Sequence, residues 1–294
     1  MDAAGWLGAL HEVVATHLGA VRTVETIAVS ETRAVFLVTT GATHYVVKLA
    51  TTQARPGIDY TATATAQDLA RRAGVPVADV VAVGETTDGV LLQYVIQEQV
   101  EGTEWRKVRP QLRDAEVARA SAEIAQMLVT MQTVAMPRFG SLAKLALIGD
   151  AGLVEALQAR ISLRIRDGSN RELAQQALQQ HGELFRTDPR PTLTHDDLHH
   201  ANLLFRRAGD GWHLVAVLDW DKAWAGSAEC DLARMAFWDD MTDGTFWSVY
   251  RTSVQPDDGW AARAMIYQLL WCLEYEATTA RHRADTAALL AALT

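Results

Sequence analysis

The hydrophobic pattern divides this chain into a strand-rich first third and a helix-rich remainder, and this division limits the folds that it can adopt. Up to about residue 100, most apolar residues occur in short runs rich in Val, Ile, Thr and aromatic residues, such as "AVFLVTT" and "HYVVKLA". Runs of this kind predict β-strands, three of them between residues 21 and 50 and two more around a turn at Asp88 and Gly89. Beyond about residue 104, Leu, Ala, Ile and Gln recur mostly at helical spacing.

The other expected elements follow from the same periodicities. They are helices at about 3–18, 59–73, 111–135 and 150–187, a short strand at 213–220, and further helices after residue 227. We therefore predict an α+β fold of two lobes. Residues 1–100 would form an N-terminal lobe around an antiparallel sheet, and residues 101–294 a larger, mainly helical lobe.

Charge and composition argue against several classes of protein. The net charge of −9 argues against a nucleic-acid partner, because phosphate neutralisation needs a basic surface. The first residues lack the basic start of a signal peptide, and no apolar run approaches the roughly 20 residues of a transmembrane helix. The cysteines Cys230 and Cys272 form no spaced pair, which is typical of reduced thiols. We expect a cytoplasmic protein with no membrane partner, as a monomer or weak dimer.

The stretch "THDDLHHANLL", residues 194–204, allows three interpretations. His195 and His199 stand four residues apart, as zinc ligands on a helix do, but no third ligand follows them. Polar residues beside a turn can also serve only to satisfy backbone groups. The third interpretation is a catalytic loop, because Asp197 precedes Asn202 by five residues and a second acidic motif, "VLDWDKAWAGSAECDLA", follows.

Phosphoryl transfer from a nucleotide needs three kinds of group at one point. These are a carboxylate that orients the acceptor hydroxyl, oxygen ligands for magnesium, and a cation on the α- and β-phosphates. Asp197 can supply the first and Lys48 the last. Asn202 and Asp219 can supply the metal ligands. The order of these residues along the chain is that of the protein-kinase motifs.

The two motifs resemble those of the aminoglycoside phosphotransferase family, which has a protein-kinase-like fold. That family's loop usually reads His-Gly-Asp-Leu-His-x-x-Asn, and its metal strand reads Ile-Asp-Trp-Glu and continues to a Gly-x-x-x-x-Asp-Leu-Ala segment like residues 226–233 here. The resemblance covers nearly the whole chain. It implies that Asp197 is the catalytic base or orienting carboxylate and that Asn202 and Asp219 bind Mg²⁺. It further implies that ATP or GTP is the phosphate donor and that Asp231 ties the metal strand to the next helix.

The resemblance also implies roles for residues outside these motifs. His195 and His199 are expected to hold the loop by hydrogen bonding, and Lys48 stands where the third strand's phosphate-binding lysine belongs. The segment "YVIQEQVEG" is similar to the hinge between the lobes. Backbone groups of Glu98 and Val100 would pair there with the edge of the purine.

The loops of this chain depart from the family at two points. The glycine of His-Gly-Asp is Asp196 here, and a second carboxylate beside Asp197 is expected to raise the pKa of the pair. The loop "VSETRAVF" after the first strand contains no glycine that would cradle phosphates. Ser30, with Thr32 or Arg33, is expected to reach the phosphates instead.

A third departure concerns the partner of the lysine. Kinases usually pair it with a helix glutamate, but no Glu occurs between residues 49 and 84. Thr63 or Thr65 has about the expected register, and Asp59 and Asp68 are the nearest acids. Either an aspartate substitutes, or the helix sits differently, or the lysine has no partner without ligand. The missing glutamate and the glycine-free loop support the alternative of a catalytically inactive pseudokinase.

The acceptor pocket of this family lies mostly in the C-terminal part of the helical lobe. From residue 221 to the end, this chain has 11 acids against 6 bases. Acids beside aromatic rings suit a cationic, hydroxyl-bearing ligand, although such aromatics are also typical of a core and such charges of a solvated surface. The candidate acceptor residues are Asp239, Asp240, Glu274, Glu276 and Trp271.

These observations predict a kinase that phosphorylates a hydroxyl of a small molecule. An aminoglycoside or another cationic antibiotic is the first expected acceptor. A metabolic kinase for an amino alcohol, a sugar or a natural-product intermediate would carry the same motifs. The spectrum of phosphorylated acceptors would separate these two possibilities.

Overall fold

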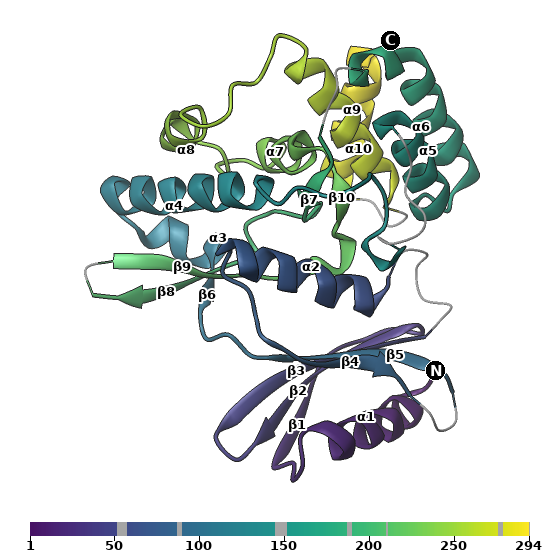
Figure 1. The fold of residues 1–294 in the computed structure, drawn as a ribbon, viewed down its shortest axis with the longest axis vertical. Coiled ribbons are helices and arrows are strands. Elements are labelled where there is room, and N and C mark those ends of the chain that lie inside the picture. The colour runs from purple at the N-terminus through teal and green to yellow at the C-terminus, as the bar shows by residue number, and fades with distance from the viewer. Residues whose placement is uncertain are drawn as a thin grey trace.

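The computed structural model of the chain consists of a β-sheet region and a larger helical region (Figure 1). It describes residues 1–51, 58–86, 90–144, 152–186, 190–209, 211–275 and 279–293. The expected turn at Asp88 and Gly89 and the candidate residue Glu276 lie outside these ranges.

The N-terminal region is an antiparallel sheet of five strands in the order β1-β2-β3-β5-β4. The strands are β1 (Thr23–Val29), β2 (Arg33–Thr40), β3 (Thr43–Thr51), β4 (Val80–Glu85) and β5 (Leu92–Glu98). Each strand predicted in this part of the sequence is therefore present. The register places Lys48 of β3 opposite Val35 of β2 and Val95 of β5, so the lysine lies on a central strand.

Two helices flank the sheet. Helix α1 (Ala3–His17) packs Trp6 and Leu10 against sheet residues such as Phe36 on the side away from the helical region (Figure 1). Helix α2 (Tyr60–Ala73) lies between the sheet and the helical region (Figure 1). It ends at Gly74, whose backbone is left-handed (φ 95°) and whose amide donates to the carbonyl oxygens of the last turn.

The helical region contains one hairpin and several short strands besides its helices. Its elements are β6 (Thr103–Glu104), α3 (Trp105–Val108), η1 (Arg109–Gln111), α4 (Asp114–Gln132), η2 (Leu142–Lys144), α5 (Leu153–Arg164), α6 (Gly168–His181), η3 (Gly182–Phe185), β7 (Thr192–Thr194), β8 (Leu203–Ala208), β9 (Gly211–Val217), η4 (Trp220–Lys222), β10 (Trp224–Gly226), α7 (Ala228–Ala236), α8 (Gly244–Tyr250), α9 (Trp260–Leu273) and α10 (Ala280–Leu293). The hairpin β8–β9 pairs in antiparallel register. Residues 195–202 precede β8 and residues 218–222 follow β9, so both segments lie at the same end of the hairpin, where Leu203 pairs with Val217.

The structure corrects two details of the predicted elements. The single helix expected over 150–187 is α5 and α6, because α5 ends at Arg164 and Asp167 caps a new helix by accepting from the amide of Asn170. The strand expected over 213–220 ends at Val217, and Asp219 follows it in a left-handed backbone conformation. The predicted two-lobed, kinase-like α+β architecture is confirmed.

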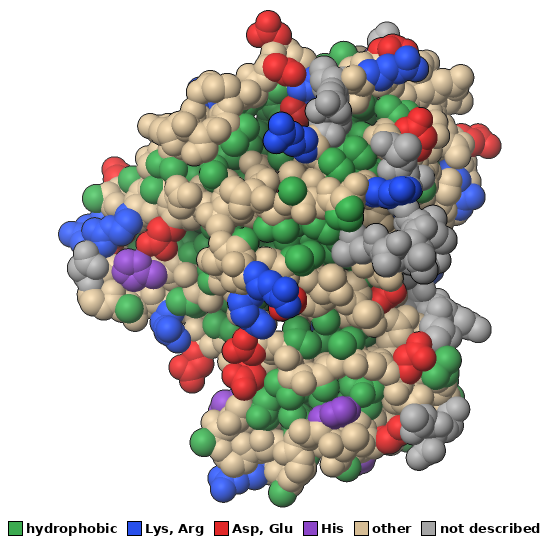
Figure 2. Space-filling view, in the orientation of Figure 1, with side chains coloured by type: hydrophobic (Ala, Val, Ile, Leu, Met, Phe, Trp, Pro, Cys, Tyr) green, Lys and Arg blue, Asp and Glu red, His purple; other side chains and the backbone are tan. Residues whose placement is uncertain are grey.

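The surface of the molecule carries charges of both signs. Figure 2 shows Lys and Arg side chains interspersed with Asp and Glu side chains over the visible face. Among the described helices, none combines the length and the apolarity that a membrane crossing requires.

Candidate active site

The predicted catalytic loop, residues 195–202, connects β7 to β8 and is held at its start by a buried carboxylate. Asp231 of α7 accepts hydrogen bonds from the backbone amides of His195 (2.9 Å) and Asp196 (2.7 Å). Burial raises the pKa of Asp231 to about 7, against the opposing effect of these two amides. Asp231 therefore fastens the catalytic loop to α7, whereas the sequence suggested a link from the metal strand.

The imidazole of His195 is fixed on both sides. Its Nδ1 accepts from the amide of Asp197 (3.2 Å), so Nε2 carries the proton and donates to the carbonyl oxygen of Leu218 (2.7 Å). This leaves no nitrogen of His195 for zinc, and the described part of the chain holds no group of three or more His, Cys, Asp or Glu side chains placed for a metal. The ring joins the catalytic loop to the residue just before Asp219.

The second half of the loop is held by the next two histidines. Nδ1 of His199 accepts from the amide of Ala201 (3.1 Å), and its ring packs against Trp238. Burial lowers the pKa of His199 to about 4, so the ring is neutral near pH 7. Nε2 of His200 contacts the carbonyl oxygen of Asp239 at 2.7 Å.

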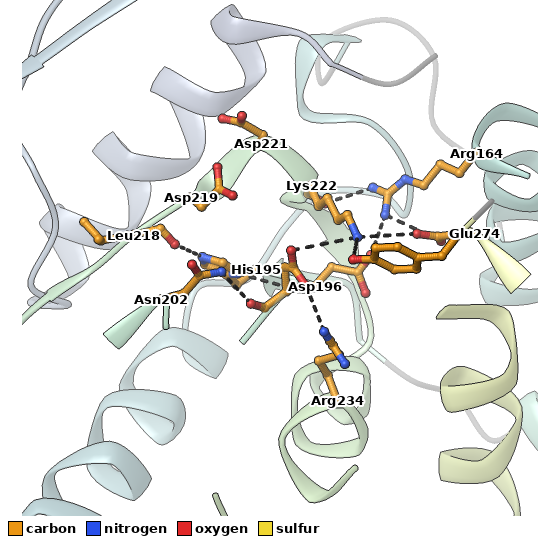
Figure 3. A network of polar contacts seen from close by, with 12 residues as sticks. Arg164, His195, Asp196, Asn202, Leu218, Asp219, Asp221, Lys222, Arg234 and Glu274 are labelled. Atoms are coloured by element: carbon orange, nitrogen blue, oxygen red, sulfur yellow. Dashed lines mark hydrogen bonds and ion pairs between the residues drawn. The ribbon is translucent and has the colours of Figure 1, made fainter. Parts of the chain in front are cut away.

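Asp196, where the resembled loop has glycine, adopts a left-handed backbone with φ 63°. Aspartate tolerates this conformation better than most residues, because its short polar side chain can bond locally. The carboxylate lies in a buried cluster of charges with two arginines of α5, Arg160 at 3.1 Å and Arg164 at 2.5 Å. Figure 3 shows Asp196 and Arg164 of this cluster beside the catalytic loop.

Asp197 lies between two cations. Arg234 of α7 donates to Oδ1 at 3.1 Å, and Nζ of Lys222 is 3.8 Å from Oδ2. Burial alone raises the pKa of Asp197, but Lys222 and Arg234 outweigh it and hold the pKa below its ordinary range. For Asp197, the rise in pKa expected from the adjacent carboxylate is therefore wrong, because the charges of Lys222 and Arg234 act in the opposite direction. The side chain of Asn202 donates to the carbonyl oxygen of Asp197 (2.9 Å) and so braces the loop.

The predicted phosphate-binding lysine and the predicted metal ligand meet across the two regions. Nζ of Lys48 donates to Oδ1 of Asp219 at 2.7 Å and to Oδ1 of Asp221, in η4, at 3.0 Å. Burial alone lowers the pKa of Lys48, but Asp221 and Asp219 raise it by more, so the ammonium stays charged. In return, Lys48 holds the pKa of Asp219 below its usual range.

Helix α2 supplies no carboxylate to Lys48. Asp59 caps the helix by accepting from the amide of Ala62, and Asp68 pairs with Arg72 on the exposed face. Thr63 has the register expected of the missing glutamate; it is buried, and its Oγ1 lies 3.5 Å from Oδ1 of Asp221. Of the three possibilities that the sequence left open, the contacts favour an aspartate beside Lys48, and this aspartate comes from η4 instead of the helix.

The residues expected around the nucleotide are less closely gathered. Ser30 is exposed at the β1–β2 turn, where its Oγ accepts from the amide of Arg33 (3.0 Å). The guanidinium of Arg33 instead reaches into the site and lies 3.6 Å from Asp221. In the expected hinge, the amide of Glu98 donates to the carbonyl oxygen of Asp79 (2.8 Å) and is used within the protein. Val100 follows the end of β5 and is partly exposed.

Two of the expected acceptor residues are occupied by the chain's own cations. The side chain of Glu274 is 6% exposed and receives Nε and Nη2 of Arg160 at 2.9 and 2.6 Å. Nζ of Lys222 approaches it at 3.8 Å (Figure 3). The ring of Trp271 stacks on the guanidinium of Arg234, whose Cζ is 3.3 Å from the ring centroid. Glu274 and Trp271 thus each lie beside a cation, as expected of an acceptor pocket, but these cations are side chains of the protein itself.

The remaining candidates for the acceptor pocket lie at the surface. Asp239 is 77% exposed and pairs with Arg281 (2.9 Å). Asp240 is 62% exposed and pairs with Arg109 (3.1 Å). Glu276 lies outside the described residues.

Sequence reasoning missed five charged residues of the site. Asp221 and Lys222 stand inside the quoted acidic motif. The sequence therefore shows that they are close to Asp219, but not the direction in which their side chains point. Arg160 and Arg164 stand four residues apart and therefore on one face of α5, a spacing that usually marks a solvated surface. Arg234 directly follows the Asp-Leu-Ala segment of the same motif.

Comparisons with known proteins agree with this arrangement. The model of the phosphotransferase enzyme family (APH) matches residues 23–266. A search of curated protein sequences gives no match.

Solved structures share the fold over nearly the full length of both chains. A thermostable mutant of aminoglycoside phosphotransferase APH(4)-Ia, in a ternary complex with AMP-PNP and hygromycin B, has a TM-score of 0.68 and 18% identity, covering 97% of this chain and 96% of that one. A putative aminoglycoside phosphotransferase from Ralstonia eutropha jmp134 has a TM-score of 0.67 and 18% identity, with coverage of 98% and 95%. The GDP and kanamycin complex of APH(2″)-IIIa has a TM-score of 0.60 and 17% identity, with coverage of 98% and 97%. At these identities the likeness establishes a common fold.

Proposed function

The chain belongs to the phosphotransferase enzyme family, and we propose that it transfers the γ-phosphate of ATP or GTP to a hydroxyl of a small molecule. One observation carries the proposal: Lys48 of the sheet contacts Asp219, and Asp219 follows Leu218, to which His195 of the catalytic loop is bonded. A phosphate-binding cation, a candidate metal ligand and the Asp197 loop are thereby joined in one connected site. Two relatives of the same fold were solved with AMP-PNP and with GDP, which supports a nucleoside triphosphate donor.

The proposed reaction follows from this arrangement. The acceptor oxygen bonds to the γ-phosphorus, the bond from that phosphorus to the bridging oxygen breaks, and the nucleoside diphosphate leaves. The hydroxyl proton passes to the carboxylate of Asp197. Because the pKa of Asp197 is held low by Lys222 and Arg234, we infer that the carboxylate mainly orients the hydroxyl and takes the proton late. Lys48 balances phosphate charge.

The chain's own residues suit a divalent cation. Asn202 and Asp219 offer the oxygen donors that Mg²⁺ prefers, and the side chain of Asp219 is 39% exposed. The left-handed backbone of Asp219, with φ 62°, is a strained conformation of the kind found at functional sites. When bound there, Mg²⁺ would neutralise charge on the transferring phosphates.

We further propose a division of labour between the lobes. Residues 1–100 would bind the nucleotide through Lys48 and through backbone groups of Val100 and of Glu98, apart from the Glu98 amide that already donates to Asp79. Residues 101–294 would carry the catalytic loop and the acceptor site. Arg33 is a better candidate than Ser30 for a phosphate contact, because its guanidinium already reaches Asp221.

The first acceptor class that we propose is an aminoglycoside or another cationic antibiotic. The names of the solved relatives support it, and Asp239 and Asp240 are exposed acids at the end of α7. A second class is a metabolite without several positive charges, such as a sugar or a natural-product intermediate. The observation that favours it is the pairing of Glu274 with Arg160 and Lys222, because a carboxylate already paired attracts a cationic ligand less.

The test is magnesium-dependent transfer of labelled phosphate from ATP, and in parallel from GTP. The acceptors are kanamycin, hygromycin B, other hydroxylated antibiotics, amino alcohols and uncharged sugars, with Asp197→Ala as the control. Transfer to one class that vanishes in Asp197→Ala establishes the enzyme and names its acceptor class. Nucleotide binding without transfer or hydrolysis in any mixture would contradict the proposal and favour a pseudokinase.

A further inference from the structure

The two carboxylates that hold Lys48 differ in their surroundings. The side chain of Asp219 is 39% exposed, whereas that of Asp221 is only 6% exposed. Asp221 is also approached by Arg33 at 3.6 Å and by the hydroxyl of Thr63 at 3.5 Å. Asp219 is therefore open to a ligand, while Asp221 is enclosed by side chains of the protein.

A buried ammonium needs a lasting partner. Removing one member of a buried ion pair leaves an uncompensated charge in a place of low polarity, which is strongly unfavourable. The side chain of Lys48 is 10% exposed, and both of its carboxylate contacts come from the segment that contains η4. If Asp219 turns toward a metal ion, Asp221 is the carboxylate that remains with Lys48.

The helix that usually supplies this carboxylate is in place but carries none. Helix α2 packs against η4, and the side chain of Thr63 lies on the face turned toward Asp221. The one acid within α2, Asp68, is bound to Arg72 on the exposed face. Oγ1 of Thr63 lies 3.5 Å from Oδ1 of Asp221, so the two side chains occupy neighbouring positions beside Lys48.

We propose that Asp221 takes the part of the missing helix glutamate: it positions Lys48 for the nucleotide phosphates and leaves Asp219 free for the metal ion. This inference rests on the proposed phosphotransfer function and assigns a positioning residue to it. The lysine's partner and the metal ligand then belong to one short segment, residues 219–222, so that Lys48 is held without a carboxylate from α2.

A relocation of the charge tests this inference. Asp221→Ala removes the carboxylate and leaves room, and Thr63→Glu in the same chain returns a carboxylate from α2 to that room. The matched control is Thr65→Glu with Asp221→Ala, because Thr65 is on another face of α2, where its hydroxyl bonds to the carbonyl oxygen of Thr61. Asp221→Asn, which keeps the volume, serves if the alanine variant does not fold.

The first readout is the Kd for ATP in EDTA, which needs neither metal nor turnover. We expect Asp221→Ala to weaken binding by about tenfold or more, as for a lost hydrogen bond to a charged group. Thr63→Glu/Asp221→Ala should regain most of this loss, and Thr65→Glu/Asp221→Ala should not. Magnesium-dependent turnover should follow the same order, with similar melting temperatures for the two double variants.

Two results would overturn the inference. One is wild-type affinity for ATP in both Asp221→Ala and Asp221→Asn; the other is equal rescue by Thr63→Glu and Thr65→Glu, which would indicate a general charge effect. Failure of the proposed function gives a different pattern, in which the wild type binds ATP but turnover is absent or unchanged in Asp197→Ala. In that case the comparison in EDTA still decides the role of Asp221.

Discussion

Replacing Asp196 with glycine, the residue that the resembled loops usually carry, is expected to destabilise this protein. Glycine would relieve the left-handed backbone at φ 63°. It would also remove the carboxylate that Arg160 and Arg164 contact at 3.1 and 2.5 Å in a buried cluster. The two effects oppose each other, so their magnitudes decide the sign.

The electrostatic loss is the larger effect. A left-handed non-glycine residue costs about 1 kcal/mol, at the low end because aspartate tolerates the conformation. Breaking a buried ion pair costs about 3 kcal/mol, at the low end of the usual range because Arg160 keeps Glu274 at 2.6 Å. We therefore expect Asp196→Gly to lower the free energy of unfolding by about 2 kcal/mol.

The assay is urea unfolding followed by tryptophan fluorescence, with Asp196→Asn as the matched control. Asparagine removes the charge and, unlike glycine, leaves the cost of the left-handed backbone in place, so it should be about 1 kcal/mol less stable than the glycine variant. An Asp196→Gly protein as stable as the wild type would refute the reasoning. It would show that the arginine pairs contribute no more than about 1 kcal/mol, the amount that relief of the left-handed backbone returns.

Three further predictions concern stability. Arginine and lysine neighbours outweigh burial and lower the pKa of Glu274 from 4.5. The contribution of Glu274 to the free energy of unfolding is therefore present above that pH and is lost as the pH falls below it. Glu274→Gln should flatten this part of the profile of melting temperature against pH. Asp231→Ala should cost roughly 1–3 kcal/mol for each of the two buried amides that lose their acceptor, and unchanged urea unfolding would exclude this role. Gly74→Ala should lower the free energy of unfolding by about 1 kcal/mol, because φ is 95° at this position. Gly8→Ala in helix α1 should raise it by a similar amount, because no atom lies within 4 Å of the added carbon. Equal effects of the two substitutions in thermal melting would contradict the backbone argument.

Periodicity was sufficient for most of the architecture. The alternating runs before residue 100 predicted each strand of the five-stranded sheet, and Gly74 marked the end of α2. The strand β8 was missed because "LLFRRA" has only three apolar residues at its start and then charges. This segment is a strand because it pairs with β9, and that contact cannot be recognised from the residues of β8 alone.

The candidate site was predictable only as far as local motifs reach. The motifs placed Asp197, Asn202 and Asp219 on neighbouring segments, and the structure joins those segments through His195. The direction of the Asp221 side chain could not be predicted from the sequence, because it depends on the turn η4 and on the packing of α2 against that turn.

Buried charges were the hardest features to predict. Arg160 looks like a surface residue in a helix, and it is buried only because Asp196 and Glu274 arrive from other parts of the chain. For the same reason, the excess of acids near the C-terminus suggested a pocket for a cation. The structure fills part of that setting with Lys222 and Arg234.

The central claim is that Asp197 orients the hydroxyl that receives the γ-phosphate of a nucleotide, and the most direct test is the rate of γ-phosphate loss from labelled ATP and GTP with Mg²⁺. Wild type, Asp197→Ala and Asp219→Ala are compared, with water or any acceptor receiving the phosphate. The account predicts a rate that falls by at least about a hundredfold in both variants while their melting temperatures stay close to that of the wild type. A rate in either variant that stays near the wild-type value would contradict it.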